Sequence, residues 1–384
     1  MKIWKKLPFE MGNADLKHIG VIGIGKLGLC FALNLERVGY QVTGLDTNAE
    51  YVASINAKTL TSFEPQVEEL LFSSQNFVAT TDWDAVLAPE IELLFIVVAT
   101  PSLPDAGYDH TQVDAVLERL AAAGPSEIQR HLVVMCTTMP GYCDTVAPKM
   151  AALNYTLSYN PEFIAQGTII RDQQQPDQVL IGEGSAEAGD AIVEVYRQMC
   201  KNTPTFCRMS RISAEIAKLA TNCFLTTKIS FANSIGDLAT KVGGEPEKIL
   251  AAIGADKRIG SRYLGYGFGY GGPCFPRDNR ALAMFGKQAG FEVLLSQATD
   301  EVNRRHLDFQ FEQYCTRYPL SEEIVFESVT YKPGTTILEE SQQLALALRL
   351  AQAGRKVRVR DLKAVIAALQ LLYGDIFAYE SIDG

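Results

Sequence analysis

A glycine-rich segment in the second half of the chain carries the residues most able to do chemistry. Five glycines fall within positions 265–272, and Cys274 and Asp278 follow them. Ordering so many glycines costs backbone entropy, which a loop that only connects two elements has no reason to bear. Such a loop can wrap its main-chain amides around a polar ligand, and a thiolate is the softest nucleophile among the side chains. We therefore predict that Cys274 is a nucleophile, the alternative being a small buried apolar residue.

Lys218 and Asn222 form a second candidate pair. They lie four residues apart in a segment with helical spacing, so their side chains project from the same face. A lysine with an asparagine one turn along offers an amine and an amide donor to one reacting oxygen. A solvated outer face is the alternative, but neighbours such as Leu219 and Phe224 favour a largely buried surrounding.

A glycine motif near the N-terminus predicts a dinucleotide site. Residues 23–28 read Gly-Ile-Gly-Lys-Leu-Gly, between the strand-like run Ile19–Ile22 and a helical pattern that closes at Gly39. In this context the first glycine permits the tight turn, the second lets a pyrophosphate approach the backbone, and the third allows close packing of helix on strand. We therefore predict that Gly23, Gly25 and Gly28 line a nucleotide site.

The cofactor expected at this site is NAD. Asp46 ends the next strand-like run, where an acidic side chain hydrogen-bonds an adenosine ribose. At ~4 Å and an effective dielectric of about 20, a carboxylate and the extra phosphate of NADP would repel each other by roughly 4 kcal/mol per charge. No arginine directly follows Asp46 to offset this repulsion.

Three further segments lie just past strand-like runs. Thr100 and Pro101 follow the run 93–99, Thr138 follows the run 132–136, and Glu162 follows the run 155–158. Ligands bind at this edge of open α/β sheets, although threonine and proline are also ordinary turn residues. An acid, a base and a turn-capping carboxylate are all compatible with Glu162.

The order of patterns along the chain predicts an α/β protein. Strand-like and helical runs alternate over the first two hundred residues, which indicates a parallel sheet with helices on both faces. A mostly helical section follows, and its longest helix is expected to start from Ser213 as N-cap and run toward Gly243. The strand–helix pattern returns near Ile324. We predict three domains: an NAD-binding Rossmann-like domain over 1–205, a central helical domain with the cysteine loop over 206–318, and a small C-terminal Rossmann-like domain over 319–384.

Composition excludes several classes of protein. The chain has 47% apolar and 21% charged residues, which excludes wholesale disorder. Its formal net charge of −10 disfavours nucleic-acid binding. The four histidines have no metal-ligand spacing, the eight cysteines form no CxxC pair, and the longest apolar run is too short to span a bilayer. We expect a cytoplasmic protein with no metal, no nucleic-acid partner and no membrane insertion.

Together, these motifs resemble the UDP-glucose/GDP-mannose dehydrogenase family from about His18 to about Asp361. The most specific segments are 160–163, 214–230 and 269–278, and the segments 258–260 and 331–334 also match. Members of that family oxidise the C6 alcohol of a nucleotide sugar to a carboxylate with two NAD. The resemblance implies two Rossmann-like doubly wound domains joined by a central helical dimerisation domain, and hence a homodimer.

The resemblance also implies a role for each candidate residue. Cys274 would hold the half-oxidised sugar as a thiohemiacetal and then as a thioester. Lys218 and Asn222 would steady the developing oxyanion, Asp278 would position or deprotonate a water, and Glu162 with Thr138 would serve hydrolysis. The residues implied to bind the cofactor are Gly23, Gly25, Lys26, Leu27, Gly28, Asp46, Thr100, Pro101, Thr138 and Arg277. Those implied to bind the nucleotide sugar are Phe163, Ile164, Lys218, Asn222, Arg258, Tyr263, Tyr270, Gly271 and Lys332, with Arg258 reaching a neighbouring subunit.

The sequence also departs from the family pattern. Arg277 replaces a lysine, Gln166 replaces a second glutamate, and Glu339 stands where the family has an arginine. The expected reaction is UDP-glucose to UDP-glucuronate, with GDP-mannose or a UDP-N-acetylhexosamine as alternative substrates. Two other functions stay open: a single-step hydroxyacid dehydrogenase of the 6-phosphogluconate type, which has no use for Cys274, and a catalytically silent binder of nucleotide sugar or NAD.

Overall fold

The structure is a computed structural model that describes residues 18–383. The chain forms two compact units. Of the described residues, those up to Pro101 together with Asp109–Glu215 make up unit 1, and Ser102–Tyr108 together with the residues from Ile216 onward make up unit 2. The short segment Ser102–Tyr108 therefore belongs to a different unit from the residues on either side of it. The predicted domain bounds near 205 and 318 stay a prediction.

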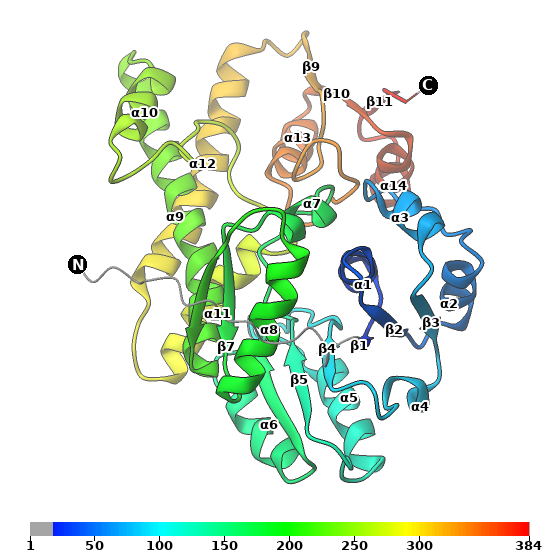
Figure 1. Cartoon of the computed structure of the whole chain (residues 1–384). Coiled ribbons are helices and arrows are strands. Elements are labelled where there is room, and N and C mark those ends of the chain that lie inside the picture. Colours follow the sequence, from blue (N-terminus) through cyan, green and yellow to red (C-terminus); the bar gives the residue numbers. More distant parts are fainter. Residues whose placement is uncertain (1–17, 384) are drawn as a thin grey trace. The chain divides into compact units, whose positions relative to one another are not determined.

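Unit 1 is built on an eight-stranded sheet with the strand order β3-β2-β1-β4-β5-β6-β7-β8 (Figure 1). The strands are β1 (His18–Ile22), β2 (Gln41–Leu45), β3 (Phe77–Thr80), β4 (Leu93–Ile96), β5 (Arg130–Val134), β6 (Tyr155–Tyr159), β7 (Gln178–Gly182) and β8 (Thr205–Met209). The helices are α1 (Lys26–Arg37), α2 (Ala49–Asn56), α3 (Val67–Ser73), α4 (Trp83–Val86), α5 (Thr111–Ala122), α6 (Tyr142–Ala151), α7 (Ile169–Gln174) and α8 (Ala186–Met199).

The order of the first six strands is that of a doubly wound dinucleotide-binding fold. Among β1 to β6, every pair of neighbouring strands runs parallel, as predicted. The sheet departs from the predicted parallel arrangement at one end, where β7 pairs antiparallel with β6 and β8 runs parallel to β7. The turns after β1, β4 and β5 therefore share the carboxyl edge of the sheet, where such folds bind their ligands.

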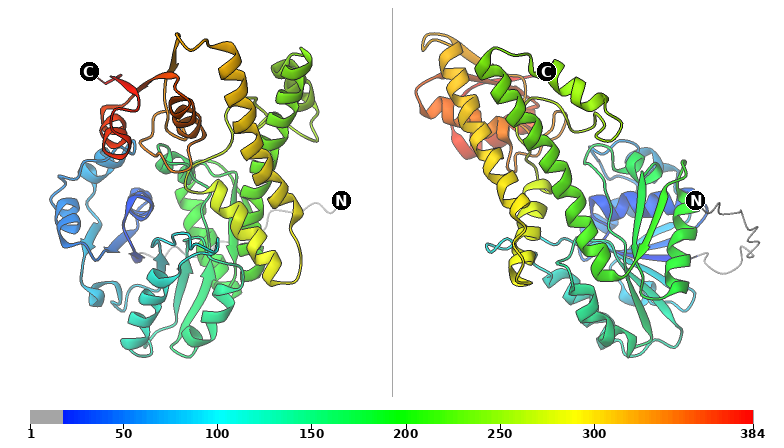
Figure 2. Two further views of the ribbon diagram at one scale, coloured as in Figure 1. Left: turned by 180° about the vertical axis from the view of Figure 1, so that it is seen from behind. Right: turned by 90° about the vertical axis from the view of Figure 1, so that its left-hand side faces the viewer.

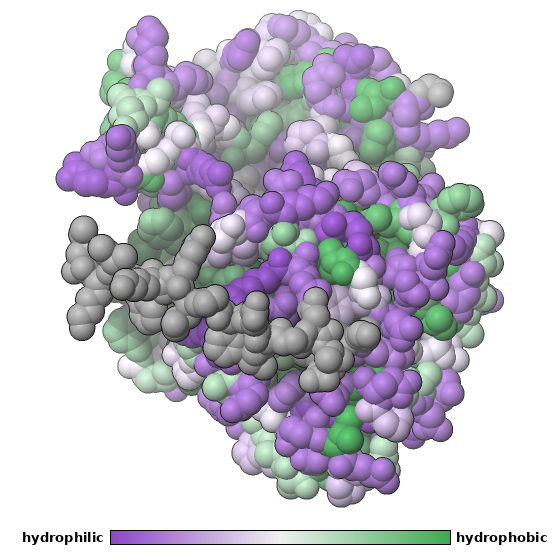
Figure 3. Space-filling view, in the orientation of Figure 1, coloured by the Kyte–Doolittle hydropathy of each residue, from purple (hydrophilic) through white to green (hydrophobic). Residues whose placement is uncertain are grey.

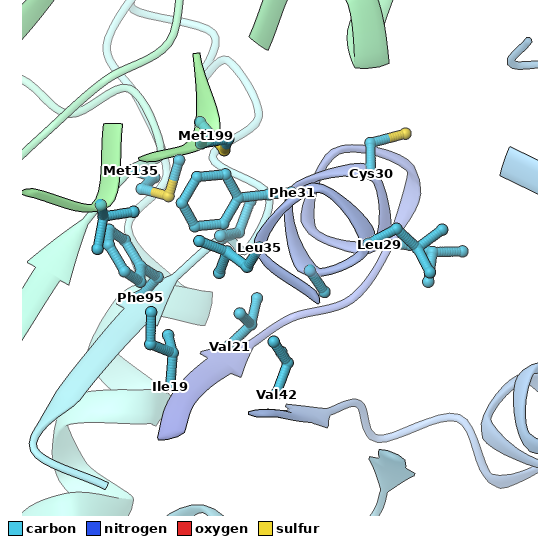
Figure 4. Packing of buried hydrophobic residues seen from close by; sticks show 14 of the residues in the cluster. Ile19, Val21, Leu29, Cys30, Phe31, Leu35, Val42, Phe95, Met135 and Met199 are labelled. Carbon is cyan, nitrogen blue, oxygen red and sulfur yellow. The ribbon is translucent and has the colours of Figure 1, made fainter. Parts of the chain in front are cut away.

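The sheet is covered by apolar side chains from α1. All four residues of β4 are buried, as expected for a central parallel strand. Phe31 projects from α1 onto Phe95 of β4, and their rings meet edge to face with centroids 4.8 Å apart (Figure 4). Met135 and Met199 complete this cluster around the ring. The packing fixes α1 over the sheet, and with it the glycine turn from which the helix starts.

Unit 2 combines long helices with a second, smaller sheet. Its helices are α9 (Arg211–Val242, which begins in unit 1), α10 (Pro246–Ala255), α11 (Phe275–Gln288), α12 (Leu294–Arg317), α13 (Gln342–Gln352) and α14 (Lys363–Tyr373). Its strands β9 (Glu323–Phe326), β10 (Lys356–Asp361) and β11 (Ala378–Ser381) form a parallel sheet in the order β11-β10-β9. Figure 2 shows α9 and α12 side by side, and the Thr227 and Thr299 hydroxyls meet between them at 3.2 Å.

The predicted α/β class, with a Rossmann-like domain and a long central helix, is confirmed. One detail was wrong: Ser213 is not the N-cap of the long helix. The helix already begins at Arg211, and the carbonyl of Ser210 accepts from the Ala214 amide. The Ser213 hydroxyl instead pairs with that of Ser210 at 2.8 Å.

On the face drawn in Figure 3, apolar residues are interspersed among hydrophilic ones. Among residues 18–383, no helix combines the length and apolar character that crossing a membrane requires. Over the same residues, no group of three or more histidines, cysteines and carboxylates is arranged to hold a metal ion.

The packing at the glycine turn predicts the effect of two matched substitutions. A Cβ on Gly28 would lie 1.9 Å from the Gly23 carbonyl oxygen, whereas a Cβ on Gly25 would meet no atom within 4 Å. We expect Gly28→Ala to lower the free energy of unfolding by about 1–3 kcal/mol through overpacking. Gly25→Ala serves as the control and should leave it within about 0.5 kcal/mol. Urea unfolding measures both, and equal midpoints for the two variants would contradict the close packing.

Candidate active site

The glycine turn of unit 1 has the geometry of a pyrophosphate cradle. Gly23 has a φ of +88°, and a Cβ there would lie 2.5 Å from the Val97 carbonyl oxygen, so both its conformation and its surroundings require glycine. Beside Gly25 the space is open. The helix α1 then starts at Lys26, with its unpaired amides and positive dipole end directed at this space. The turn therefore fits the phosphates of a dinucleotide.

Asp46 is placed to receive the ribose of such a dinucleotide. It directly follows β2 and is half-buried. Its Oδ1 accepts from the Asn48 amide at 3.0 Å, which orients the carboxylate. Because β2 lies next to β1 in the sheet, Asp46 emerges at the same edge as the glycine turn. The structure thus brings together the main residues of the predicted cofactor site.

A buried glutamate organises the loop that carries Thr138. Thr138 is fully buried, and its hydroxyl donates to Glu215 Oε1 at 2.8 Å. The Glu215 carboxylate also accepts from the amides of Gly141 (2.6 Å) and Cys143 (3.0 Å). Burial raises the pKa of Glu215, while these hydrogen bonds act in the opposite direction. Sequence reasoning gave Glu215 no role, although it lies in a segment that matches the family pattern.

Thr100 and Glu162 also lie in unit 1, each just after a strand. Thr100 is buried and Pro101 beside it is exposed. Glu162 is half-buried, as are Phe163 and Ile164 after it. The side-chain amide of Gln173 donates to Glu162 Oε2 at 2.9 Å.

A cluster in unit 2 joins four of the six residues expected to take part in the chemistry. Cys274 directly precedes α11, and Asp278 lies in the first turn of that helix, with its amide donating to the Cys274 carbonyl at 2.9 Å. Lys218 and Asn222 share one face of α9, and both are buried. The Asn222 side-chain amide donates to Asp278 Oδ2 at 2.6 Å. Lys218 acts electrostatically on the Cys274 thiol.

Tyr108 is a site residue that sequence reasoning missed. Its hydroxyl donates to Asp278 Oδ1 at 2.5 Å, so both oxygens of this buried carboxylate have a donor. The Arg277 guanidinium lies over the Tyr108 ring, 5.0 Å from its centroid. Because 170 residues separate Tyr108 from Asp278, no local pattern could indicate the contact. Tyr108 closes the segment that leaves unit 1 to join unit 2.

Cys274 has the surroundings of a controlled nucleophile. Among the eight cysteines, all of which lie within residues 18–383, it alone is exposed. The pKa of its thiol is raised, first because the surrounding protein desolvates the sulfur and second because Asp278 is nearby. Arg277 and Lys218 act in the opposite direction, and Glu339 raises the pKa slightly further. The N-terminus of α11 also favours the thiolate.

The remaining residues predicted to bind the nucleotide sugar differ in their burial and contacts. Gly271 and Lys332 are half-buried, and Tyr270 is buried with its hydroxyl donated to Asp300. Tyr263 is half exposed, and its ring contacts that of Phe275 edge to face. The Arg258 side chain is 87% exposed and pairs with Asp256 at 2.6 Å.

Comparison with known proteins identifies the family to which these features belong. Residues 17–200 match the pattern of the "UDP-glucose/GDP-mannose dehydrogenase family, NAD binding domain", and residues 212–305 match the central domain of that family. A UDP-glucose 6-dehydrogenase from Pseudomonas aeruginosa is 32% identical over 89% of this chain and 78% of its own length. The structure of a UDP-glucose dehydrogenase from Pyrobaculum islandicum superposes with a TM-score of 0.84 at 30% identity, covering 96% of this chain and 87% of that one.

A GDP-mannose dehydrogenase structure from Pseudomonas aeruginosa is more distant. Its TM-score is 0.58 at 26% identity, and it covers 94% of this chain and 87% of its own.

The electrostatics around Cys274 predict how its reactivity changes with pH. Because the raised pKa keeps the thiol protonated, alkylation of Cys274 by iodoacetamide should rise with pH later than for a free cysteine. Asp278→Asn removes a neighbouring negative charge and should move this rise to lower pH, whereas Arg277→Gln should move it to higher pH. Peptide mass spectrometry of the alkylated site gives the rates, and Cys274→Ala is the control for modification elsewhere. A rise unmoved by Asp278→Asn would show that the carboxylate does not act on the thiol.

Proposed function

Because the chain belongs to the UDP-glucose/GDP-mannose dehydrogenase family, we propose that it oxidises the C6 alcohol of a nucleotide sugar to a carboxylate, with UDP-glucose as the first choice of substrate. The observation that carries the proposal is the cluster of Cys274, Lys218, Asn222 and Asp278. It combines an exposed nucleophile with buried groups that can manage charge and protons. A single-step dehydrogenase would need no such thiol.

NAD is the cofactor of this family's N-terminal domain, and the glycine turn fits it. It supplies the hydride acceptor for both oxidations. The backbone at Gly23 and Gly25 would hold the pyrophosphate against the N-terminus of α1, and Asp46 would accept from the ribose hydroxyls. Lys26, Leu27, Gly28, Thr100, Pro101, Thr138 and Arg277 complete the proposed cofactor set.

In the first oxidation, the C6 alcohol becomes an aldehyde. Lys218 and Asn222 steady the oxygen as it loses its proton, because a buried ammonium and an amide donor stabilise negative charge more strongly than water does. The Cys274 thiolate then attacks C6, and the carbonyl electrons move to the oxygen, which takes up a proton. The resulting thiohemiacetal keeps the sugar in place for the second oxidation.

In the second oxidation, C6 loses another hydride and a thioester remains on Cys274. A water molecule then attacks the carbonyl carbon, the carbon–sulfur bond breaks, and the sulfur leaves as a thiolate. Glu162 takes the proton of that water, with Thr138 in support. Asp278 is buried and accepts at both oxygens, which supports a role in positioning.

We assign contacts with the substrate to Phe163, Ile164, Lys218, Asn222, Tyr263, Tyr270, Gly271 and Lys332. Arg258 is exposed and is assigned to the substrate of a neighbouring subunit.

A homodimer would be built on α9. Phe224, Phe231 and Leu238 are exposed at intervals of seven residues along this helix. An apolar stripe with that period is typical of a helix that packs against another helix. The free thiol that the chemistry requires fits a reducing cytoplasm.

GDP-mannose and a UDP-N-acetylhexosamine are the second choices of substrate. The reason is Glu339, which stands where the family pattern has an arginine. It is exposed, and its negative charge acts on the Cys274 thiol.

Counting the NADH formed tests the four-electron reaction. With UDP-glucose, GDP-mannose and UDP-N-acetylhexosamines supplied in turn, we expect one substrate to yield two NADH and one uronate per molecule. Cys274→Ala should abolish uronate formation, while Cys200→Ala, at a cysteine outside the cluster, should not. One NADH per substrate, or full activity of Cys274→Ala, would exclude the mechanism. NAD binding without turnover of any nucleotide sugar would favour a silent binder.

Discrimination between NAD and NADP tests the place of Asp46. Repulsion of about 4 kcal/mol at an effective dielectric of 20 corresponds to roughly a thousandfold preference for NAD. Asp46→Asn should raise kcat/KM for NADP by more than tenfold, and Glu50→Gln on the following helix is the matched control. Comparable rates of the unchanged protein with NAD and NADP would show that Asp46 does not contact the ribose.

A further inference from the structure

A buried chain of side-chain amides leads to Glu162. Gln174 Nε2 donates to Asn34 Oδ1 at 2.7 Å, Asn34 Nδ2 donates to Gln173 Oε1 at 2.8 Å, and Gln173 Nε2 donates to Glu162 Oε2 at 2.9 Å. Asn34 is 0% exposed, and Gln173 and Gln174 are each 2% exposed. A buried amide group without a hydrogen-bond partner costs free energy. The three hydrogen bonds therefore stabilise the orientation of these side chains.

The chain has a fixed direction. Asn34 and Gln173 each accept through the side-chain oxygen from one neighbour and donate through the nitrogen to the next, and the three side-chain donations run toward Glu162. Asn34 Nδ2 also donates to the Ile170 carbonyl at 3.4 Å. Turning the Gln173 amide over would set its NH2 against that of Asn34 and its oxygen against the carboxylate. Asn34 therefore decides that Gln173 presents a donor to Glu162, and a donor favours the ionised carboxylate.

The backbone of α7 is stabilised by contacts other than these side-chain amides. Asn34 lies on α1, the helix that starts at the glycine turn, and Gln173 lies on α7. The Glu64 carboxylate accepts from the amides of Ile169 (2.6 Å) and Gly167 (2.8 Å) and so secures the start of α7. Since α7 has this second anchor, the fold does not need a polar side chain at position 173 to place the helix.

We propose that Gln173 is a positioning residue for the hydrolytic step, acting through Glu162 and oriented by Asn34. This rests on the proposed function. Glu162, directed by the hydrogen bond from Gln173, takes the proton of the water that attacks the thioester. The carbon–oxygen bond forms, the carbon–sulfur bond breaks, and the Cys274 thiolate is regenerated. The two hydride transfers do not involve this proton acceptor.

The experiment compares formation and hydrolysis of the thioester. Gln173→Met keeps the volume of the side chain and removes the donor, and Gln175→Met makes the same change at an exposed position one residue beyond α7. The stopped-flow measurement uses the nucleotide sugar that yields two NADH in the screen proposed above. With it, both variants should release two NADH per site at the unchanged rate. The steady-state kcat of Gln173→Met should then fall roughly tenfold with an unchanged kcat/KM, because only the breakdown of the thioester is slowed by the misplaced proton acceptor.

Mass spectrometry of protein quenched during turnover should show the adduct on Cys274 accumulating in Gln173→Met. In a Glu162→Gln background, Gln173→Met should cost less than a further twofold, because the residue acts through Glu162. If Gln173→Met lowers Tm, Gln173→Glu is the substitute, since it keeps the shape and replaces the donor with a like charge.

Three results would overturn the proposal: unchanged hydrolysis in both Gln173 variants, equal slowing of NADH formation and hydrolysis, or full additivity with Glu162→Gln. Failure of the proposed function would look different, because the unchanged protein would then give no two-NADH burst with any nucleotide sugar.

Discussion

A carboxylate taken out of water needs hydrogen-bond donors in return, and in unit 2 that requirement falls on Asp278. Its donors come from two distant parts of the chain: Asn222 from the long helix and Tyr108 from a short excursion out of the dinucleotide-binding sheet. Because Asp278 lies one turn after Cys274, satisfying the carboxylate also fixes the start of α11 and the thiol in front of it. Removing either donor would take from one oxygen of this buried carboxylate its hydrogen bond from that side chain, at a cost of roughly 1–3 kcal/mol.

Unit 1 uses two carboxylates in different ways. Glu215 is wholly buried and accepts three donors from one loop, so it serves the shape of that loop. Glu162 is half-buried and accepts a hydrogen bond from Gln173, whose side chain is in turn oriented by a hydrogen bond from Asn34. Full enclosure suits a structural anchor, whereas partial exposure suits a group that exchanges protons with water.

Sequence patterns predicted the parts of the fold and site that depend on near neighbours. The glycine turn, Asp46 and the strands around them depend on residues within about thirty positions of one another. The types of these residues indicate the local conformation directly. The antiparallel pairing of β7 was not foreseen, because strand direction is decided by the path of the chain. The roles of Tyr108 and Gln173 were not predicted either, because each depends on a hydrogen bond to a residue that only the folded chain brings near.

Cys274 is an exposed residue, yet the pKa of its thiol is raised because the surrounding protein desolvates the sulfur. Peroxides attack thiolates far faster than neutral thiols, so a sulfur that stays protonated at rest resists conversion to sulfenic acid. Desolvation, which lowers the fraction of thiolate, thereby protects from oxidants the one cysteine that is exposed among residues 18–383. Full reactivity is then reserved for the moments when neighbouring cations offset the cost of ionisation.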